Sequence, residues 1–294
     1  MNTRLKTTFA LLCLLAVVLW QAYTPVLPLV IAIFCAIAVW EVAKCAQVKN
    51  KAIMVLGSAF AFLFPFFTSP HSLEPLVSAD VMTKITHFVP QTALVVAYVL
   101  VLLLIMLKGY DYTKFEHVAV VFTASMLIPF GLSTIVYFRD MHYTYSEIFT
   151  KEAGIYILFI GAISAWGTDS GAYLAGRAFG KHKMAPKISP KKTIEGAVGG
   201  ILFSVVLNLA AFFIFQKITG QTPMPWWLIA IITIPISFLG MMGDLSASVI
   251  KRNYGIKDFG KLFPGHGGVM DRFDSALFTF SALYAIVLTY VNLA

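Results

Sequence analysis

Apolar stretches long enough to cross a membrane follow one another along almost the whole chain. Nine are predicted, at residues 8–23, 26–43, 52–68, 89–107, 117–138, 153–176, 194–216, 226–246 and 274–293. Each holds about 16 to 24 residues, and about 20 helical residues cross the roughly 30 Å hydrocarbon core of a bilayer. Because lipid offers no partner to backbone polar groups, each stretch is expected to be an α-helix. The sequence therefore predicts an all-α, polytopic membrane bundle of about nine transmembrane helices.

The composition agrees with this prediction. Of the 294 residues, 59% are hydrophobic and 12% are charged, whereas roughly a quarter of the residues of a soluble domain are charged. No polar segment is long enough to fold as a separate soluble domain. Residues 1–294 are therefore expected to form a single membrane domain.

The positions of the basic residues predict how the chain is oriented. If the N-terminus is cytoplasmic, the 22 lysines and arginines fall in cytoplasmic segments with the exception of Lys84, Arg139, Lys151 and Lys217. Such an asymmetry in short loops is typical of the positive-inside rule. The net charge of +8 is thus explained by the membrane surface and does not indicate a nucleic-acid partner. A short cytoplasmic tail and the lack of an organellar presequence predict a bacterial inner membrane.

Two aspartates are predicted inside membrane helices, near the cytoplasmic boundary. Asp169 lies about 16 residues into its predicted span, which corresponds to ~24 Å at 1.5 Å per residue, and Asp244 lies at a similar depth in another span. A carboxylate in a membrane helix is costly unless it is paired or bound to a metal, so both are candidate functional residues. The alternatives are an interfacial Asp169 satisfied by water or by Arg177, and an ordinary helix-end role for Asp244.

Asp271 and Asp274 begin the last predicted span from the cytoplasmic side. Their i, i+3 spacing places them on one helical face, although a helix N-terminus also favours carboxylates for structural reasons alone. Together with Asp169 and Asp244 they make four acids at one membrane level, and such a cluster repels itself unless cations bind. Hard oxygen ligands of this kind favour Mg²⁺, and a second cation is left open.

Basic and glycine-rich stretches are predicted beside these acids. In "KISPKKTIEG", Ser189 is predicted to cap a helix that begins at Pro190, with Lys191 and Lys192 in its first turn, and a helix N-terminus binds anions. "SVIKRNYGIKD" adds Lys251, Arg252 and Lys257, and the glycines of "PGHGG" allow backbone N–H groups to approach a phosphate. The alternative is that these cations only bind anionic lipid headgroups.

Acids that hold a metal, beside cations and glycines that hold phosphate, predict phosphoryl or nucleotidyl transfer at the membrane surface. His266 could serve as a general base. An ionised phosphate nucleophile needs no base, however, so a positioning or hydrogen-bonding role is expected for His266.

Residues 248–274, "SVIKRNYGIKDFGKLFPGHGGVMDRFD", resemble the signature of the phosphatidate cytidylyltransferases, also called CDP-diacylglycerol synthases. The matching positions are Ser248, Lys251, Arg252, Lys257, Asp258, Gly260, Pro264, His266, Gly267, Gly268, Asp271, Arg272 and Asp274. Residues 165–196 are also similar to this family. The resemblance covers at least residues 160–294, and the first half is similar only in being hydrophobic.

The resemblance implies a specific reaction, in which CTP and phosphatidic acid give CDP-diacylglycerol and pyrophosphate with Mg²⁺. It implies that Asp169, Asp244 and Asp271 form the metal site, with Asp274 in support. The implied phosphate-binding cations, for the triphosphate or the lipid phosphate, are Lys191, Lys192, Lys251, Arg252, Lys257 and Arg272, and the implied substrate-binding stretches also hold Ser189, Asp258, Gly267 and Gly268. Residues 151–294 would carry the catalytic helices and residues 1–150 the scaffold. The expected partners are CTP, phosphatidic acid and membrane lipids but no nucleic acid, and a homodimer is left open.

Two other functions fit parts of the pattern. One is a CTP-dependent kinase of another membrane lipid, such as a polyprenol or dolichol, against which the full signature argues. The other is an ion-coupled transporter whose acids form a cation pathway. Transporter sites are expected near the bilayer midplane, whereas these acids are predicted near one face beside phosphate-binding cations.

Overall fold

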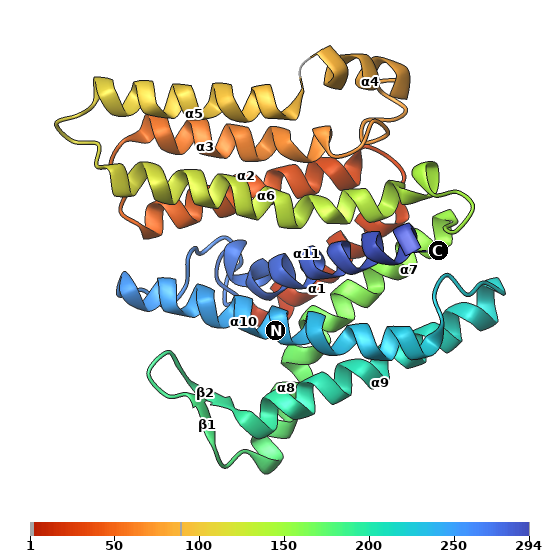
Figure 1. Cartoon of the computed structure of the whole chain (residues 1–294). Helices are drawn as coiled ribbons and strands as arrows, with labels where there is room; N and C mark the ends of the chain where they lie inside the picture. Colours follow the sequence, from red (N-terminus) through yellow and green to blue (C-terminus); the bar gives the residue numbers. More distant parts are fainter. Residues whose placement is uncertain (1–2, 89, 294) are drawn as a thin grey trace. The chain divides into compact units, whose positions relative to one another are not determined.

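The computed structural model describes residues 3–88 and 90–293, and helices dominate it (Figure 1). The α-helices are α1 (Thr3–Trp20), α2 (Val26–Cys45), α3 (Lys51–Leu63), α4 (Ala79–Phe88), α5 (Gln91–Lys108), α6 (Phe115–Thr144), α7 (Lys151–Ala162), α8 (Thr168–Phe179), α9 (Ile194–Thr219), α10 (Trp226–Asn253) and α11 (Met270–Leu293). A 3₁₀ turn, η1 (Phe64–Phe67), follows α3, and a π-helical segment, η2 (Ile163–Gly167), joins α7 to α8. The strands β1 (Lys183–Ala185) and β2 (Ser189–Thr193) form a small antiparallel hairpin.

The predicted fold class is confirmed, but the predicted number of spans is not. Within residues 3–88 and 90–293, six helices are long and apolar enough to cross a membrane, namely α2, α5, α6, α9, α10 and α11. The other three predicted spans are also helical. Their helices are shorter at Lys6–Trp20 and Lys51–Phe67, and η2 interrupts the span predicted at residues 153–176. The chain is an integral membrane protein with many helices.

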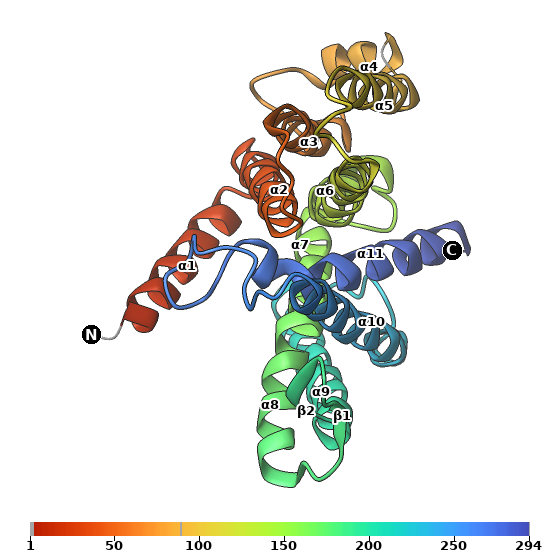
Figure 2. The ribbon, with the colours of Figure 1, turned by 90° about the vertical axis from the view of Figure 1, so that its left-hand side faces the viewer.

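The chain packs as two compact units, each made from two separate segments. The first comprises Met1–Tyr137 and Tyr254–Arg272. In it, α2, α3, α5 and α6 lie side by side around a buried apolar cluster (Figures 1 and 2). Gly57 of α3 permits close packing, because a Cβ there would overlap the side chain of Val121 on α6.

The second unit comprises Phe138–Asn253 and Phe273–Ala294. In it, α8 and α9 lie side by side and the β1–β2 hairpin extends from their ends (Figures 1 and 2). Small residues bring its helices close, as membrane helices require. A Cβ on Gly243 of α10 would overlap Phe278 of α11, and one on Gly240 would overlap Thr279. Helices α10 and α11 therefore approach each other closely at these two glycines.

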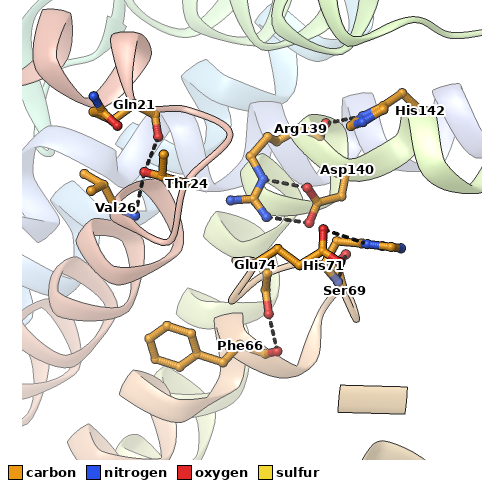
Figure 3. A network of polar contacts seen from close by, with 11 residues as sticks. Gln21, Thr24, Val26, Phe66, Ser69, His71, Glu74, Arg139, Asp140 and His142 are labelled. Carbon is orange, nitrogen blue, oxygen red and sulfur yellow. Dashed lines mark hydrogen bonds and ion pairs between the residues drawn. The ribbon is translucent and has the colours of Figure 1, made fainter. Parts of the chain in front are cut away.

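A buried ion pair lies near the C-terminal end of α6 within the second unit. Arg139 donates from Nε to Asp140 Oδ1 and from Nη2 to Asp140 Oδ2, both at 2.6 Å (Figure 3). Both residues are buried, at 2% and 4% exposure. Two parallel charge-assisted hydrogen bonds satisfy charges that would otherwise be costly to bury.

A second buried polar cluster surrounds the π-helical segment η2. Asn208 of α9 donates to Ser164 Oγ at 2.9 Å and to Thr233 Oγ1 at 3.1 Å, and Ser237 donates to Ser204 Oγ at 3.3 Å. All five side chains are fully buried. Side-chain hydrogen bonds of this kind hold membrane helices together, so the cluster fixes η2, directly before α8, against α9 and α10.

Candidate active site

In the first unit, Asp271 organises the loop that precedes α11. We call residues 254–269 the signature loop. Asp271 Oδ2 accepts hydrogen bonds from the backbone N–H groups of Phe259 at 2.8 Å, Gly268 at 3.0 Å and Gly260 at 3.4 Å. The side chain is buried. A carboxylate that gathers three N–H groups from two separate stretches of a loop fixes the shape of that loop.

Glu41 of α2 lies beside this loop and was not predicted as a site residue. Its Oε1 accepts from Val269 N at 3.2 Å and its Oε2 from Met270 N at 2.9 Å. It is 6% exposed. By the rule that singled out Asp169, a carboxylate inside a predicted span is a candidate functional residue, and Glu41 lies in the span predicted at residues 26–43. That rule would have identified it.

The tip of the signature loop contacts α1. The Thr7 hydroxyl donates to Pro264 O at 3.0 Å, and Thr8 Oγ1 lies 3.4 Å from His266 Nε2. His266 Nδ1 is buried and has no hydrogen-bond partner. These contacts agree with a hydrogen-bonding role for His266, which stays a prediction.

Glycine is required in this loop for conformational reasons as well. Gly265 and Gly267 have φ angles of 81° and 86°, in the left-handed region that other residues rarely adopt. The N–H of Gly268 is engaged by Asp271. Of the glycines predicted to bind phosphate through their N–H groups, Gly268 therefore has its donor already in use.

The second unit brings together the other three predicted aspartates and two of the predicted lysines. Lys192 of β2 forms an ion pair with Asp244 of α10, and Lys251 Nζ lies 3.9 Å from Asp274 Oδ2. Asp244 and Asp169 both lie within electrostatic range of Asp274, and Lys251 opposes their repulsion. Two ion pairs thus connect β2, α10 and α11, and Asp169 of α8 acts on Asp274 electrostatically. That these residues form one functional site stays a prediction.

The prediction of a helix capped by Ser189 and beginning at Pro190 is wrong. Ser189, Lys191 and Lys192 lie in strand β2, which pairs with β1 through Ala185↔Ser189 and Lys183↔Thr193. Helix α9 begins at Ile194, because the extended Thr193 is the residue that caps it and accepts from Gly196 N at 3.1 Å.

Glu195 holds the base of this hairpin. It accepts from Lys181 N at 3.1 Å, and its Oε1 lies 2.6 Å from His182 Nδ1. The lysines of β2 are therefore presented by a strand, not by a helix N-terminus. Their anion-binding role stays a prediction.

The remaining predicted cations divide between the units. Lys257, Arg272 and the neighbouring Asp258 are exposed in the first unit, and Lys191 and Arg252 are exposed in the second. Arg252 Nε donates to Ile188 O at 3.4 Å, which ties the end of α10 to the hairpin loop. The contiguous signature of residues 248–274 thus contributes to both units.

The described residues contain no group of three or more His, Cys, Asp or Glu side chains arranged to hold a metal ion. The chemistry of the second unit nevertheless fits a hard cation. Asp169, Asp244 and Asp274 supply carboxylate oxygens, which are the ligands that Mg²⁺ prefers, and lysine side chains balance two of these charges. A metal role for these acids and for Asp271 stays a prediction.

Comparison with known proteins identifies the family. The family model described as "Cytidylyltransferase family" matches residues 2–290. The chain belongs to the cytidylyltransferase family. The match extends well beyond residues 160–294, so the first half of this cytidylyltransferase shares more with the family than its hydrophobic character.

Three curated relatives carry the name phosphatidate cytidylyltransferase. The protein of Bacillus subtilis is 33% identical over 263 residues, which is 89% of both chains. That of Staphylococcus epidermidis is 31% identical over 250 residues, or 80% of this chain and 93% of the relative. That of Staphylococcus saprophyticus is 42% identical over 139 residues, or 47% of this chain and 52% of the relative. The family that the signature predicted is confirmed, and the chain is a nucleotidyltransferase.

Proposed function

We propose that this cytidylyltransferase joins CTP to phosphatidic acid in the membrane and releases CDP-diacylglycerol and pyrophosphate, with Mg²⁺. The observation that carries the proposal is the gathering of Asp169, Asp244 and Asp274 with Lys192 and Lys251 in the second unit. Acids and cations at one place match a reaction between a nucleoside triphosphate and a phosphate. The name of the relatives suggests phosphatidate as the lipid substrate, and the apolar helices support access to a substrate in the membrane.

The chemistry is a phosphoryl substitution. An ionised phosphate oxygen of phosphatidic acid attacks the α-phosphorus of CTP, and a new P–O bond forms as the bond from the α-phosphorus to the α,β-bridging oxygen breaks. Pyrophosphate leaves with that electron pair. The nucleophile carries no proton at neutral pH, so no general base is needed and His266 serves as a hydrogen-bonding residue.

The proposed roles of the side chains follow from their charge. Lys191, Lys192, Lys251, Arg252, Lys257 and Arg272 would bind the phosphates of CTP and of the lipid. Asp169, Asp244 and Asp274 would hold Mg²⁺, with Asp271 in support. When bound, Mg²⁺ supplies neutralisation of the triphosphate charge and of the leaving pyrophosphate. The lysines paired with these acids would remain close enough to bind the same phosphates.

The decisive experiment uses CTP labelled either at the α-phosphorus or at the γ-phosphorus. Purified protein is incubated with phosphatidic acid in detergent micelles, with Mg²⁺ or with EDTA. The proposal predicts α-label in a lipid product, γ-label in pyrophosphate and no lipid product in EDTA. Transfer of the γ-label to a lipid would establish the kinase alternative. No product from a folded protein would overturn the proposal, and full activity in EDTA would remove the metal from it.

The predicted position of the active site on the cytoplasmic face is tested with membrane vesicles of defined sidedness. CTP does not cross the bilayer, so bacterial inner-membrane vesicles should form CDP-diacylglycerol from added CTP only when they are inside-out. Activity confined to right-side-out vesicles would overturn the proposed orientation. A homodimer stays a prediction, which light scattering of the detergent-solubilised protein would test.

A further inference from the structure

The Glu41 carboxylate joins two segments that are 228 residues apart in the chain. Its two oxygens each accept one backbone hydrogen bond, at 3.2 Å from Val269 N and 2.9 Å from Met270 N. The first N–H groups of a helix have no partner inside that helix, and α11 begins at Met270. Glu41 therefore satisfies the start of α11 and places a negative charge at the positive end of its dipole.

Two glycines of the signature loop provide the space for this carboxylate. A Cβ built on Gly260 or on Gly268 would overlap the Glu41 carboxyl group. For Gly268, the three nearest atoms to such a Cβ all belong to Glu41. Gly268 lies outside the left-handed region, unlike Gly267 with a φ of 86°. The lack of a side chain at Gly268 is thus explained by Glu41 and not by backbone conformation.

Three successive N–H groups are divided between two carboxylates. Gly268 N donates to Asp271 Oδ2, whereas Val269 N and Met270 N donate to Glu41. Any shift of Glu41 would therefore move the backbone that Asp271 also holds. Through this shared backbone, Glu41 acts on Asp271 and on the loop that carries Lys257.

We propose that Glu41 is a positioning residue for cytidylyl transfer, which fixes the signature loop and the first turn of α11 in one orientation toward the substrates. The proposal rests on the function proposed above. It gives α2 a part in positioning the signature loop, in the half of the chain from which only a scaffold was expected. Glu41 itself touches no reacting atom.

A double-mutant cycle tests this proposal. Gly268→Ala, Glu41→Ala and the double variant are purified, and kcat, the KM for CTP and the thermal unfolding temperature in detergent are measured. Each single variant should lower kcat about 30-fold with KM changed by less than about threefold, because orientation is lost and not binding. In the Glu41→Ala background, Gly268→Ala should lower kcat by a further factor of less than about three, because the overlapping carboxylate is gone.

Gly267→Ala is the matched control. The expected loss of kcat in this variant arises from the positive φ and from Asp271 Oδ2, which lies 2.9 Å from a Cβ built at this position. It should therefore lower kcat by the same factor with and without Glu41. Glu41→Gln should retain more activity than Glu41→Ala, since an amide oxygen still accepts one of the two hydrogen bonds.

Several outcomes would overturn the proposal while the wild-type protein remains an active cytidylyltransferase. One is a Glu41→Ala variant with normal kcat per folded molecule, even if its unfolding temperature falls. Another is an equal loss from Gly268→Ala in both backgrounds. If Glu41→Ala does not insert, Glu41→Gln decides, because normal kcat in that isosteric variant would also contradict a positioning role. Inactive but folded wild-type protein would instead refute the proposed function.

Discussion

Asp271 and Asp244 belong to the same predicted set of acids, but the two units neutralise them in different ways. Asp271 accepts three N–H groups of its own loop, whereas Asp244 pairs with the Lys192 side chain. Backbone donors are fixed by the fold, but a lysine ammonium sits on a flexible four-carbon stem. The comparison teaches that Asp271 is already committed to loop structure, whereas Asp244 has a lysine counterion that a metal cation can replace.

The largest expected effect comes from Asp271→Asn. The amide retains one acceptor but loses the charge that gathers three donors, so the loop should lose its shape. We expect kcat to fall on the order of 10³-fold, as when a fixed electrostatic contact is removed from an active site. Circular dichroism and insertion should be unchanged. Activity within tenfold of wild type would show that the loop does not depend on this charge.

The pair in the second unit should respond differently to the loss of each partner. Asp244→Asn is expected to lower kcat on the order of 10²-fold. Lys192→Ala should lower kcat/KM for CTP about tenfold and also lower the Mg²⁺ concentration needed for half-maximal activity, because Lys192 competes with the metal for Asp244. Magnesium titrations measure this, with Lys187→Ala as a control that removes the same charge from the exposed hairpin loop. An unchanged magnesium requirement in Lys192→Ala would show that Mg²⁺ does not compete with Lys192 for Asp244.

Asn208→Leu separates stability from catalysis in the second unit. Loss of its hydrogen bonds to Ser164 and Thr233 should destabilise the fold by about 1–2 kcal/mol. The activity per folded molecule should stay within about threefold, because no acid is touched. Thermal unfolding and kcat of the same preparation provide the test. A kcat loss as large as that of Asp244→Asn would place the cluster around η2 in the catalytic machinery.

The smallest effect is expected from Lys84→Ala. Lys84 is exposed on α4 and is predicted to face away from the cytoplasm. Its removal should change kcat/KM for CTP by less than about twofold, since Lys84 is predicted on the side of the membrane opposite the active site. A large loss of activity would contradict the predicted orientation of the chain.

Much of the fold could be predicted because membrane helices are specified locally. Length and hydropathy alone place each predicted span on a helix. The common depth of Asp169, Asp244 and Asp274 stays a prediction. The interruption of the span at residues 153–176 by η2 could not be predicted. It depends on Asn208 of α9, which donates to Ser164 of η2 and also to Thr233 of α10.

The start of α9 shows a different limit. Ser189 and Pro190 carry the local signals of a helix start, and Thr193 carries a capping side chain of its own. Pairing with β1 keeps Ser189 and Pro190 in an extended strand, so the helix begins only after Thr193. A local sequence pattern contains no information on this pairing. The role of Glu41 was missed because its partners are backbone N–H groups far along the chain, which leave no trace in residue type except the glycines at 260 and 268.

The contact between Glu41 and the start of α11 also has a consequence for how the protein is made. α2 enters the membrane early in synthesis, and Met270 follows 229 residues later. At about 5–20 residues per second, the interval is on the order of 10–45 s. For that time a carboxylate near the membrane surface waits for the hydrogen bonds that its final position requires. A ribosome that stops before the last helix thus leaves Glu41 without the two backbone N–H donors that it has in the complete chain.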